Sequence, residues 1–502
     1  MSASRSSQQK EALCTHGIIY TDKSPHATAL SYYEPPSIEQ RLAASTRSTK
    51  PTTGNSTVNV PRNSTFPGVN LAPQDALDID HKEAPQSLSS FSFNNYRNLV
   101  TPERRTLYVV DAPSLAPEAS VMATWADPVV PPRMQDESEA AVVDASRPQV
   151  TDIAEYIQDF YHGLDVKVLR NHFCFAPWPG SSVDSRKGDG GNTRRSRTYV
   201  GLGLVDGDGA ATRVRVRTSL DGVAPGQLNL CDVLDALHVC VPQDAFAVVL
   251  VTHHDLYEDE EDDFCAGRAY GGSRICVVST FRYHPALDSY SNIDHAHSWP
   301  ASHCRTYIDA LWETSEPELK AMTKGKKGQS FDYSCMLRLK NDGNTPLAAA
   351  VKASRDSLTP RSKAGWDGIW LARVCRTASH ELGHCVGMGH CVYYACVMQG
   401  TANMAEDVRQ PPYLCPVCLA KVAYSVAGES VMKSRGTRKE ERSQAAEDDW
   451  VVESYRRVVG FCERWQHVGM FKGYSAWLGA RLRELGAVET QDGAEDNRGL
   501  PL

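Results

Sequence analysis

Apolar runs of two kinds divide the middle of the chain into predicted strands and helices. Arg105 to Val110 is β-branched and aromatic, which predicts a strand, and Ala245 to Val251 is apolar without interruption, as in a strand covered on both faces. Further strands are predicted at Leu164 to Leu169 and Arg274 to Thr280.

Helical periodicity predicts helices at Asp152 to Tyr161, Leu228 to Val239, His303 to Glu313, Trp366 to Val386 and Asp448 to Leu485. Strands that alternate with helices indicate an α/β fold.

The first part of the chain has a different pattern. Ser, Thr, Pro, Asn and Gln dominate residues 1–94, which we therefore expect to be disordered, apart from short structured segments at Ala12 to Tyr20 and Pro35 to Leu42. A single folded domain is expected over residues 95–485, followed by a flexible tail at 486–502. Within the domain, the Gly- and Arg-rich stretch Arg186 to Arg197 and the stretch Gly325 to Gly343 are interpreted as insertions.

Composition and net charge limit the classes of molecule that the chain is expected to bind. The chain has 502 residues and a net charge of −8, which gives no electrostatic reason to expect nucleic acid or an anionic membrane as a partner. No apolar run is long enough to span a bilayer, and the first residues lack the apolar stretch of a signal peptide. The predicted location is therefore the cytoplasm or nucleus. In such a reducing compartment, closely spaced cysteines indicate a metal site more strongly than disulfides.

One helix carries a motif with metal-ligand spacing. His380 and His384 are four residues apart, so on a helix their imidazoles project from one face and can share a metal ion, with Glu381 beside them. His390 could supply a third imidazole, but ten further residues of helix would carry it about 15 Å along the axis. The helix must therefore end and the chain reverse, and Gly387 is the residue that tolerates the required backbone.

Three neutral imidazoles would leave the fourth position of a zinc ion open to water. Zinc would acidify this water, and Glu381, which is not a ligand, would act as general base and then pass the proton to the leaving amine. The predicted function is zinc-dependent hydrolysis of peptide bonds. The alternatives are a non-enzymatic zinc protein that offers a peptide-binding or scaffold surface, and hydrolysis of a non-peptide amide.

Four cysteines follow the histidine motif without a gap. Cys391 and Cys396 form one pair and Cys415 and Cys418 the other, a spacing that indicates a closed tetrahedral zinc site with a structural role. Four buried free thiols or an iron–sulfur cluster are the alternatives. The chain is therefore expected to bind two zinc ions. Met398, between the pairs, would fill a gap in the core if it had no other role.

This run of residues resembles the archaemetzincin family of metallopeptidases, whose pattern is HExxHxxGxxH, then CxxxxCxM, then CxxC. The resemblance is most specific over residues 378–422. It implies a metzincin-like domain with a mixed sheet, an active-site helix and a mainly helical C-terminal subdomain. It also implies that Met398 forms a turn beneath the catalytic zinc. Upstream, Ser279 to Arg282 is similar to a family segment that would be an edge strand able to pair with an extended substrate.

Some weaker features have simpler interpretations. The six carboxylates of Glu258 to Asp263 are interpreted as a solvated loop, and Gly201-Leu202-Gly203 as a turn. None of the upstream cysteines stands out as a zinc-blocking thiol, although Cys14, in the region expected to be flexible, could be tested for that role. Five further histidines are interpreted as ordinary surface or core residues, namely His253, His254, His295, His297 and His303.

Overall fold

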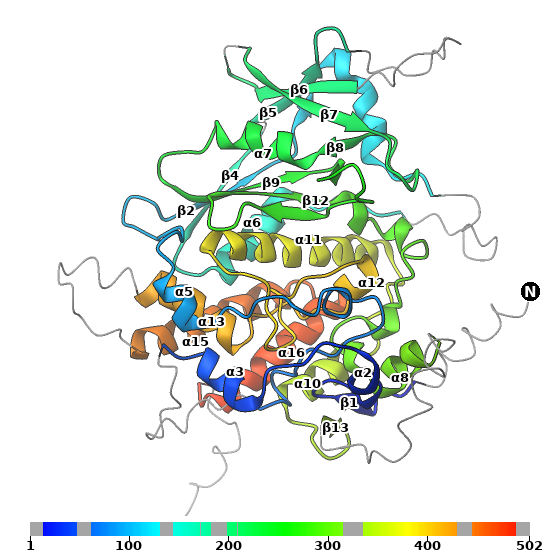
Figure 1. Ribbon diagram of the computed structural model, residues 1–502, viewed down its shortest axis with the longest axis vertical. Helices are drawn as coiled ribbons and strands as arrows, with labels where there is room; N and C mark the ends of the chain where they lie inside the picture. Colours follow the sequence, from blue (N-terminus) through cyan, green and yellow to red (C-terminus); the bar gives the residue numbers. More distant parts are fainter. Residues whose placement is uncertain are drawn as a thin grey trace, which may run out of the picture.

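The computed structural model describes residues 14–47, 62–130, 144–170, 172–181, 198–207, 209–314, 335–428 and 444–487. The fold is mixed α/β, as predicted. Figure 1 shows the two large sheets in one half of the molecule and most of the helices in the other, with α11 (Lys363–Val386) lying lengthwise between them. Among the described residues, none of the helices combines the length and the apolar character needed to cross a membrane.

A five-stranded sheet lies next to α11. Its order is β11-β12-β9-β2-β4, all parallel except β11, and the strands are β2 (Thr106–Val110), β4 (Asp165–Leu169), β9 (Ala245–Thr252), β11 (Gly267–Ala269) and β12 (Ile275–Ser279). Every residue of β9 is buried, as its unbroken apolar run predicts. Its alternate side chains enter different cores: Val249 and Val251 pack in the cluster that contains α11, whereas Val248 and Leu250 pack in the cluster that contains α7 (Leu230–His238).

A second, six-stranded sheet packs beyond α7 and was not predicted. Its order is β10-β8-β7-β6-β5-β3, and the strands are β3 (Ser114–Leu115), β5 (Phe173–Pro177), β6 (Thr198–Leu204), β7 (Ala211–Arg217), β8 (Gln227–Asn229) and β10 (Asp255–Tyr257). The interpretation of Gly201-Leu202-Gly203 as a turn is wrong, because these residues lie inside β6. A Cβ atom at Gly203 would lie 2.6 Å from the Ala210 carbonyl oxygen, so close strand approach requires glycine there.

The predicted helices are present with shifted ends. The predicted stretch from Asp448 to Leu485 forms two helices, α15 (Gln444–Glu463) and α16 (Gly469–Glu484). Gly469 is the first residue of the second helix, and a Cβ atom there would lie 2.6 Å from the Ser357 carbonyl oxygen, so this close contact requires glycine. The other helices are α6 (Val150–Phe160), α8 (Arg305–Thr314), α10 (Pro346–Ser354), α12 (Met404–Asp407) and α13 (Pro416–Ala423), with 3-10 turns at η1 (Pro117–Ala126), η3 (Phe281–Tyr283), η4 (Pro285–Leu287), η5 (His295–His297) and η6 (Ala301–His303) and a π-helical turn at η8 (Tyr424–Gly428).

Structured segments were expected only at Ala12 to Tyr20 and Pro35 to Leu42. The expectation of disorder for the rest of residues 1–94 is wrong where the structure describes them, because residues 14–47 and 62–94 are folded. They form β1 (Ile18–Tyr20), α2 (Pro25–Leu30), α3 (Ile38–Ala44), α4 (Ala76–Ile79) and α5 (Leu88–Phe93), and β1 pairs with β13 (Met336–Arg338). Apolar side chains of this region are buried against the rest of the chain, among them Phe66 and Phe91. Their burial stabilises a region whose overall composition is polar. The predicted insertion at 186–197 and the predicted tail from 488 onward lie outside the described residues.

Candidate metal centre

Three histidines meet at the C-terminal end of α11. The Nε2 atoms of His380 and His384 are 3.0 Å apart. The helix ends at Gly387, whose φ of 104° lies in the left-handed region and whose N–H bonds to carbonyls of the last turn. The chain then reverses and brings His390 to the other two, so that one ligand nitrogen from each lies within 4.8 Å of the others. The helix therefore ends at Gly387, as predicted from the spacing of the three histidines.

Each imidazole is oriented through its Nδ1 atom. His380 Nδ1 lies 2.6 Å from the Val397 carbonyl oxygen, His384 Nδ1 2.8 Å from the Met388 carbonyl oxygen, and His390 Nδ1 2.7 Å from Glu83 Oε1. Since a proton on Nδ1 makes each of these hydrogen bonds, the Nε2 lone pairs face the common centre.

Electrostatics also favours the neutral rings that bind metal. Burial and the neighbouring imidazole of His390 lower the pKa of His384 to about 4. Burial, followed by the charges of His384 and His390, lowers the pKa of His380 well below its usual value. Neutral imidazoles with converging Nε2 atoms are a donor set that fits zinc.

Two residues that orient the third histidine were not predicted. Besides Glu83, the Gln86 side chain donates to the Gly387 carbonyl and accepts from the Gly389 N–H, at 3.0 Å in both cases, and so bridges the turn before His390. Both residues lie in the region that was expected to be disordered. They lie about 300 residues before the histidine motif in the sequence. A spacing pattern within a short stretch of sequence could therefore not have identified them.

Removing the Glu83 carboxylate should loosen His390. We expect Glu83→Ala to weaken zinc binding at the three histidines by about 10- to 100-fold, the usual effect of losing a hydrogen-bond partner of a metal-binding histidine. Glu83→Gln should weaken it less, because an amide oxygen can still accept the Nδ1 proton. Competition with a chromophoric chelator measures the affinity, with the exposed Glu118→Gln as control. Equal affinities in all four proteins would show that Glu83 does not position His390.

A cavity of about 680 Å³ opens over the histidines. Glu381 lines it together with the three rings and is 5% exposed. Burial raises the pKa of the Glu381 carboxyl to about 8, although the Arg268 guanidinium acts in the opposite direction. A carboxyl with such a pKa can both accept and release a proton near neutral pH.

The strand beside this cavity is β11. The expectation that Ser279 to Arg282 forms the edge strand is wrong: Ser279 ends β12, which lies between β11 and β9, and the following residues form the turn η3. The edge strand on this side of the sheet is β11, and β4 is the other edge strand. A Cβ atom at Gly267, the first residue of β11, would lie 2.8 Å from Glu381 Oε1, so this strand passes close beside the carboxylate only because the residue is glycine.

The four cysteines also converge on one point. Their sulfur atoms lie within 4.8 Å of one another, and all four residues are buried. Backbone N–H groups of Met398 and Cys415 lie 3.5 and 3.2 Å from Cys396 Sγ. Hydrogen bonds from the other three cysteines lower the pKa of Cys391, first among them Cys396. Four converging sulfurs with backbone donors fit a tetrahedral zinc ion.

Residues 396–398 connect the two clusters. Cys396 belongs to the four cysteines, while the carbonyl of the next residue, Val397, holds His380 Nδ1. The N–H of Cys391 donates to the Met398 carbonyl at 2.7 Å. A Cβ atom at Gly383 would lie 2.4 Å from Met398 Sδ, so Met398 packs against the helix one residue before His384. The three-histidine and four-cysteine clusters are therefore neighbours in space as well as in sequence.

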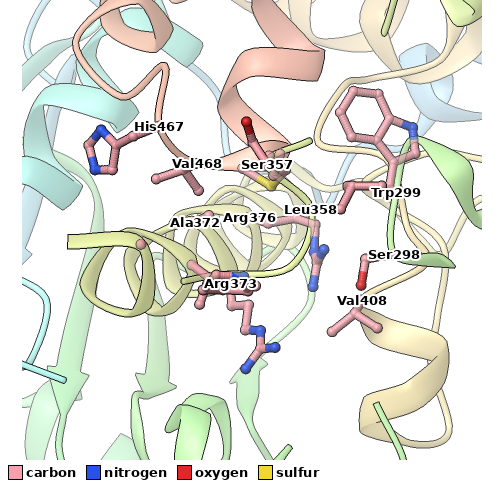
Figure 2. Close-up of a pocket in the computed structure, with 15 residues that line it drawn as sticks. Ser298, Trp299, Ser357, Leu358, Ala372, Arg373, Arg376, Val408, His467 and Val468 are labelled. Carbon is pink, nitrogen blue, oxygen red and sulfur yellow. The ribbon is translucent and has the colours of Figure 1, made fainter. Parts of the chain in front are cut away.

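A much smaller cavity, of about 30 Å³, lies along another part of α11, between that helix, Trp299 and the α15–α16 connection with His467 and Val468 (Figure 2). Its lining includes two buried arginines of α11. Arg373 pairs with Asp288 at 2.7 Å, and Arg376 pairs with Asp407. None of the seven candidate ligands lines it, and its size and paired charges indicate a packing defect between elements.

The other candidate residues lie elsewhere. His253, His254 and His303 are hydrogen-bonded to Thr280, Met122 and Gly68 respectively, as expected of ordinary structural histidines. Cys14 contacts Cys304 and Thr306. It belongs to a cluster separate from the three histidines, which gives no support to its role as a zinc-blocking thiol.

Comparison with known proteins relates the chain to one family. The model of peptidase family M54 matches residues 362–424, which contain both clusters. Archaemetzincin-2 of Macaca fascicularis and of Homo sapiens are each 25% identical over 346 residues, which are 69% of this chain and 66% of the relative. Archaemetzincin-1 of Rattus norvegicus is 35% identical over 196 residues, which are 39% of this chain and 30% of the relative. The chain thus spans slightly less than two thirds of these archaemetzincin-2 relatives.

Solved structures of similar proteins include archaemetzincin from Methanopyrus kandleri, which is 16% identical and has a TM-score of 0.29. The match covers 65% of this chain and 97% of that one. Archaemetzincin from Archaeoglobus fulgidus, solved in complex with malonate, is 15% identical and has a TM-score of 0.26. That match covers 63% of this chain and 99% of the other.

Proposed function

We propose that this chain, which belongs to the archaemetzincin family of zinc metallopeptidases, hydrolyses peptide bonds at a zinc ion held by His380, His384 and His390. The observation that carries the proposal is the convergence of three oriented imidazoles on the wall of an open cavity, with Glu381 lining the same cavity. A closed site would serve structure alone, whereas an open one gives a substrate access to the metal.

Glu381 is the proposed general base. Zinc, when bound, supplies the Lewis acidity that makes water a nucleophile at neutral pH. A Glu381 carboxylate oxygen takes the proton of the attacking water and then delivers it to the leaving nitrogen. Burial raises the pKa of this carboxyl to about 8, which suits both transfers. The carboxylate need not move, because it already lines the cavity wall beside the three rings.

The edge strand β11 is the proposed binding surface for the peptide backbone. Its outer side has no partner strand in the sheet formed by the described residues, so its N–H and C=O groups can pair with an extended substrate. Gly267 and Arg268 of this strand line the cavity next to Glu381. This placement would lay the peptide along the cavity that the three histidines also line.

A peptide-library assay tests the proposal. The zinc-loaded chain should cleave peptides, lose this activity when a chelator strips the three-histidine site, and regain it when zinc is returned. A fully loaded chain that cleaves nothing in a diverse library would overturn the proposal and favour a scaffold protein.

The two clusters should release zinc differently. We propose that the three histidines hold one zinc ion, which a chelator removes readily because the site opens into a cavity, and that the four buried cysteines hold a second ion, retained until the chain unfolds. Timed chelation followed by elemental analysis measures both. His384→Ala should abolish only the fast phase. A single release phase, or an unchanged fast phase in His384→Ala, would contradict the assignment.

A further inference from the structure

A third group of potential metal ligands lies far from α11 in the sequence. Ligand atoms of Cys14, His297 and Cys304 lie within 4.8 Å of one another, and the two sulfurs are 3.1 Å apart. These residues come from three segments: the chain before β1, the turn η5, and the residue after η6. An isolated antiparallel bridge between Ile19 and Cys304 holds the first segment against the third. The cluster is therefore assembled by the tertiary fold.

His297 is oriented like a ligand. Its Nδ1 lies 2.5 Å from Asp294 Oδ2, and its ring stacks on Tyr307 with centroids 4.3 Å apart. Its Nε2 is buried and has no nitrogen or oxygen partner among the described residues, and the group that interacts with the ring from the cluster is the Cys14 thiol. A carboxylate on one imidazole nitrogen with the other nitrogen left for a metal is the usual arrangement of a zinc-bound histidine. Without such a partner, a buried imidazole nitrogen would destabilise the fold.

His16 supplies a second unpaired imidazole. It is buried, and its ring lies edge-on to that of His297 with centroids 5.1 Å apart. Its Nε2 also has no nitrogen or oxygen partner among the described residues, and its side chain interacts with the Cys14 thiol. Its φ of 49° is in the left-handed region, which is uncommon for a residue other than glycine. The backbone is thus held in an unusual conformation at the point where the ring turns towards the cluster.

We propose that Cys14, His16, His297 and Cys304 form a third zinc site. Two thiolates and two imidazoles are a common donor set of structural zinc. The Thr306 hydroxyl lies 3.1 Å from Cys14 Sγ and 3.3 Å from Cys304 Sγ, where its O–H can donate to a thiolate. A disulfide between the two cysteines would leave both Nε2 atoms unpaired, whereas a zinc ion satisfies all four groups.

The site would fasten the N-terminal segment to the rest of the molecule. This segment reaches the four cysteines as well, because the Tyr33 hydroxyl donates at 2.5 Å to the carbonyl of Val392, which follows Cys391. Figure 1 shows two elements of the N-terminal segment, β1 and α2, beside α8 in the helical half of the molecule. The third zinc is therefore structural and adds one ion to the two already proposed, independently of peptide hydrolysis.

Elemental analysis of the full chain, purified under reducing conditions and dialysed against zinc, tests the proposal. We expect three zinc ions per chain, and two in Cys14→Ser. The matched control Cys240→Ser, a half-buried cysteine outside all three clusters, should keep three. Equal zinc content in Cys14→Ser and the unaltered chain would overturn the proposal.

Thiol reactivity gives a second measurement that needs no variant. In the zinc-loaded chain, Cys14 and Cys304 should be alkylated much more slowly than Cys240 and should become reactive after chelation. Peptide mass spectrometry locates the label. Alkylation of Cys14 as fast as Cys240 despite full zinc loading, or a Cys14–Cys304 disulfide in the chain as isolated from cells, would contradict the third site.

Discussion

Replacement of Glu381 by glutamine is expected to lower kcat/KM for peptide cleavage by about 10²- to 10⁴-fold, the range that a general acid–base group contributes. Glutamine preserves the size of the side chain but cannot accept the proton of the attacking water. Glu381 is not among the three converging imidazoles, so the variant should bind as much zinc as the unaltered chain. Burial costs the neutral amide less than the carboxylate, so the fold should be at least as stable.

The experiment separates an enzyme from a scaffold. Cleavage rates and zinc content are measured on the same samples, with Glu118→Gln as a control for the loss of one negative charge at an exposed position. If the variant cleaves as fast as the unaltered chain with equal zinc content, then Glu381 is not the general base. If neither protein cleaves although both are fully loaded, a peptide-binding surface becomes the better account.

Replacement of Cys415 by serine is expected to weaken zinc binding at the histidines by about 10- to 100-fold, although Cys415 lies in the other cluster. Loss of one thiolate should release the ion of the four cysteines and free Cys396, whose sulfur accepts the Cys415 N–H at 3.2 Å. The next residue, Val397, holds His380 Nδ1 through its carbonyl. Loss of the cysteine-bound ion should therefore disturb His380 through the peptide unit that joins Cys396 to Val397. Cys391→Ser should act similarly, because the Cys391 N–H bonds to the Met398 carbonyl.

Cys462→Ser is the matched control. Cys462 is fully buried on α15 and belongs to none of the metal-ligand clusters of the described residues, so this variant makes the same chemical change in the core. It should lower the free energy of unfolding while leaving zinc affinity at the histidines unchanged. Chelator competition with all three variants gives the comparison. If Cys415→Ser and Cys462→Ser bind zinc at the histidines equally tightly, the cysteine cluster does not support the catalytic site.

The parts of the molecule that were predicted correctly depend on local patterns. The spacing of His380 and His384 fixes their common helical face, and the reach of His390 requires the turn at Gly387, where the structure has it. The unbroken apolar run of β9 and the helical period of α6 likewise indicate which side chains are buried from a short stretch of sequence. Such patterns need no knowledge of distant residues.

The parts that were missed depend on contacts between distant segments. Glu83 contacts His390, which lies some 300 residues further along the chain, and Glu83 belongs to a region whose polar composition masks its buried apolar side chains. The glycines of β6 indicated a turn, but they allow close approach of a neighbouring strand that is visible only in the fold. The place of β11 at the sheet edge is likewise a property of strand order, which a three-residue strand does not encode locally.

Anomalous X-ray scattering at the zinc edge from crystals of the full chain tests the central claim most directly. The account predicts one peak about 2.0–2.1 Å from the Nε2 atoms of His380, His384 and His390, and another about 2.3 Å from the four sulfurs of Cys391, Cys396, Cys415 and Cys418. A zinc-loaded crystal with no peak among the three histidines would contradict it.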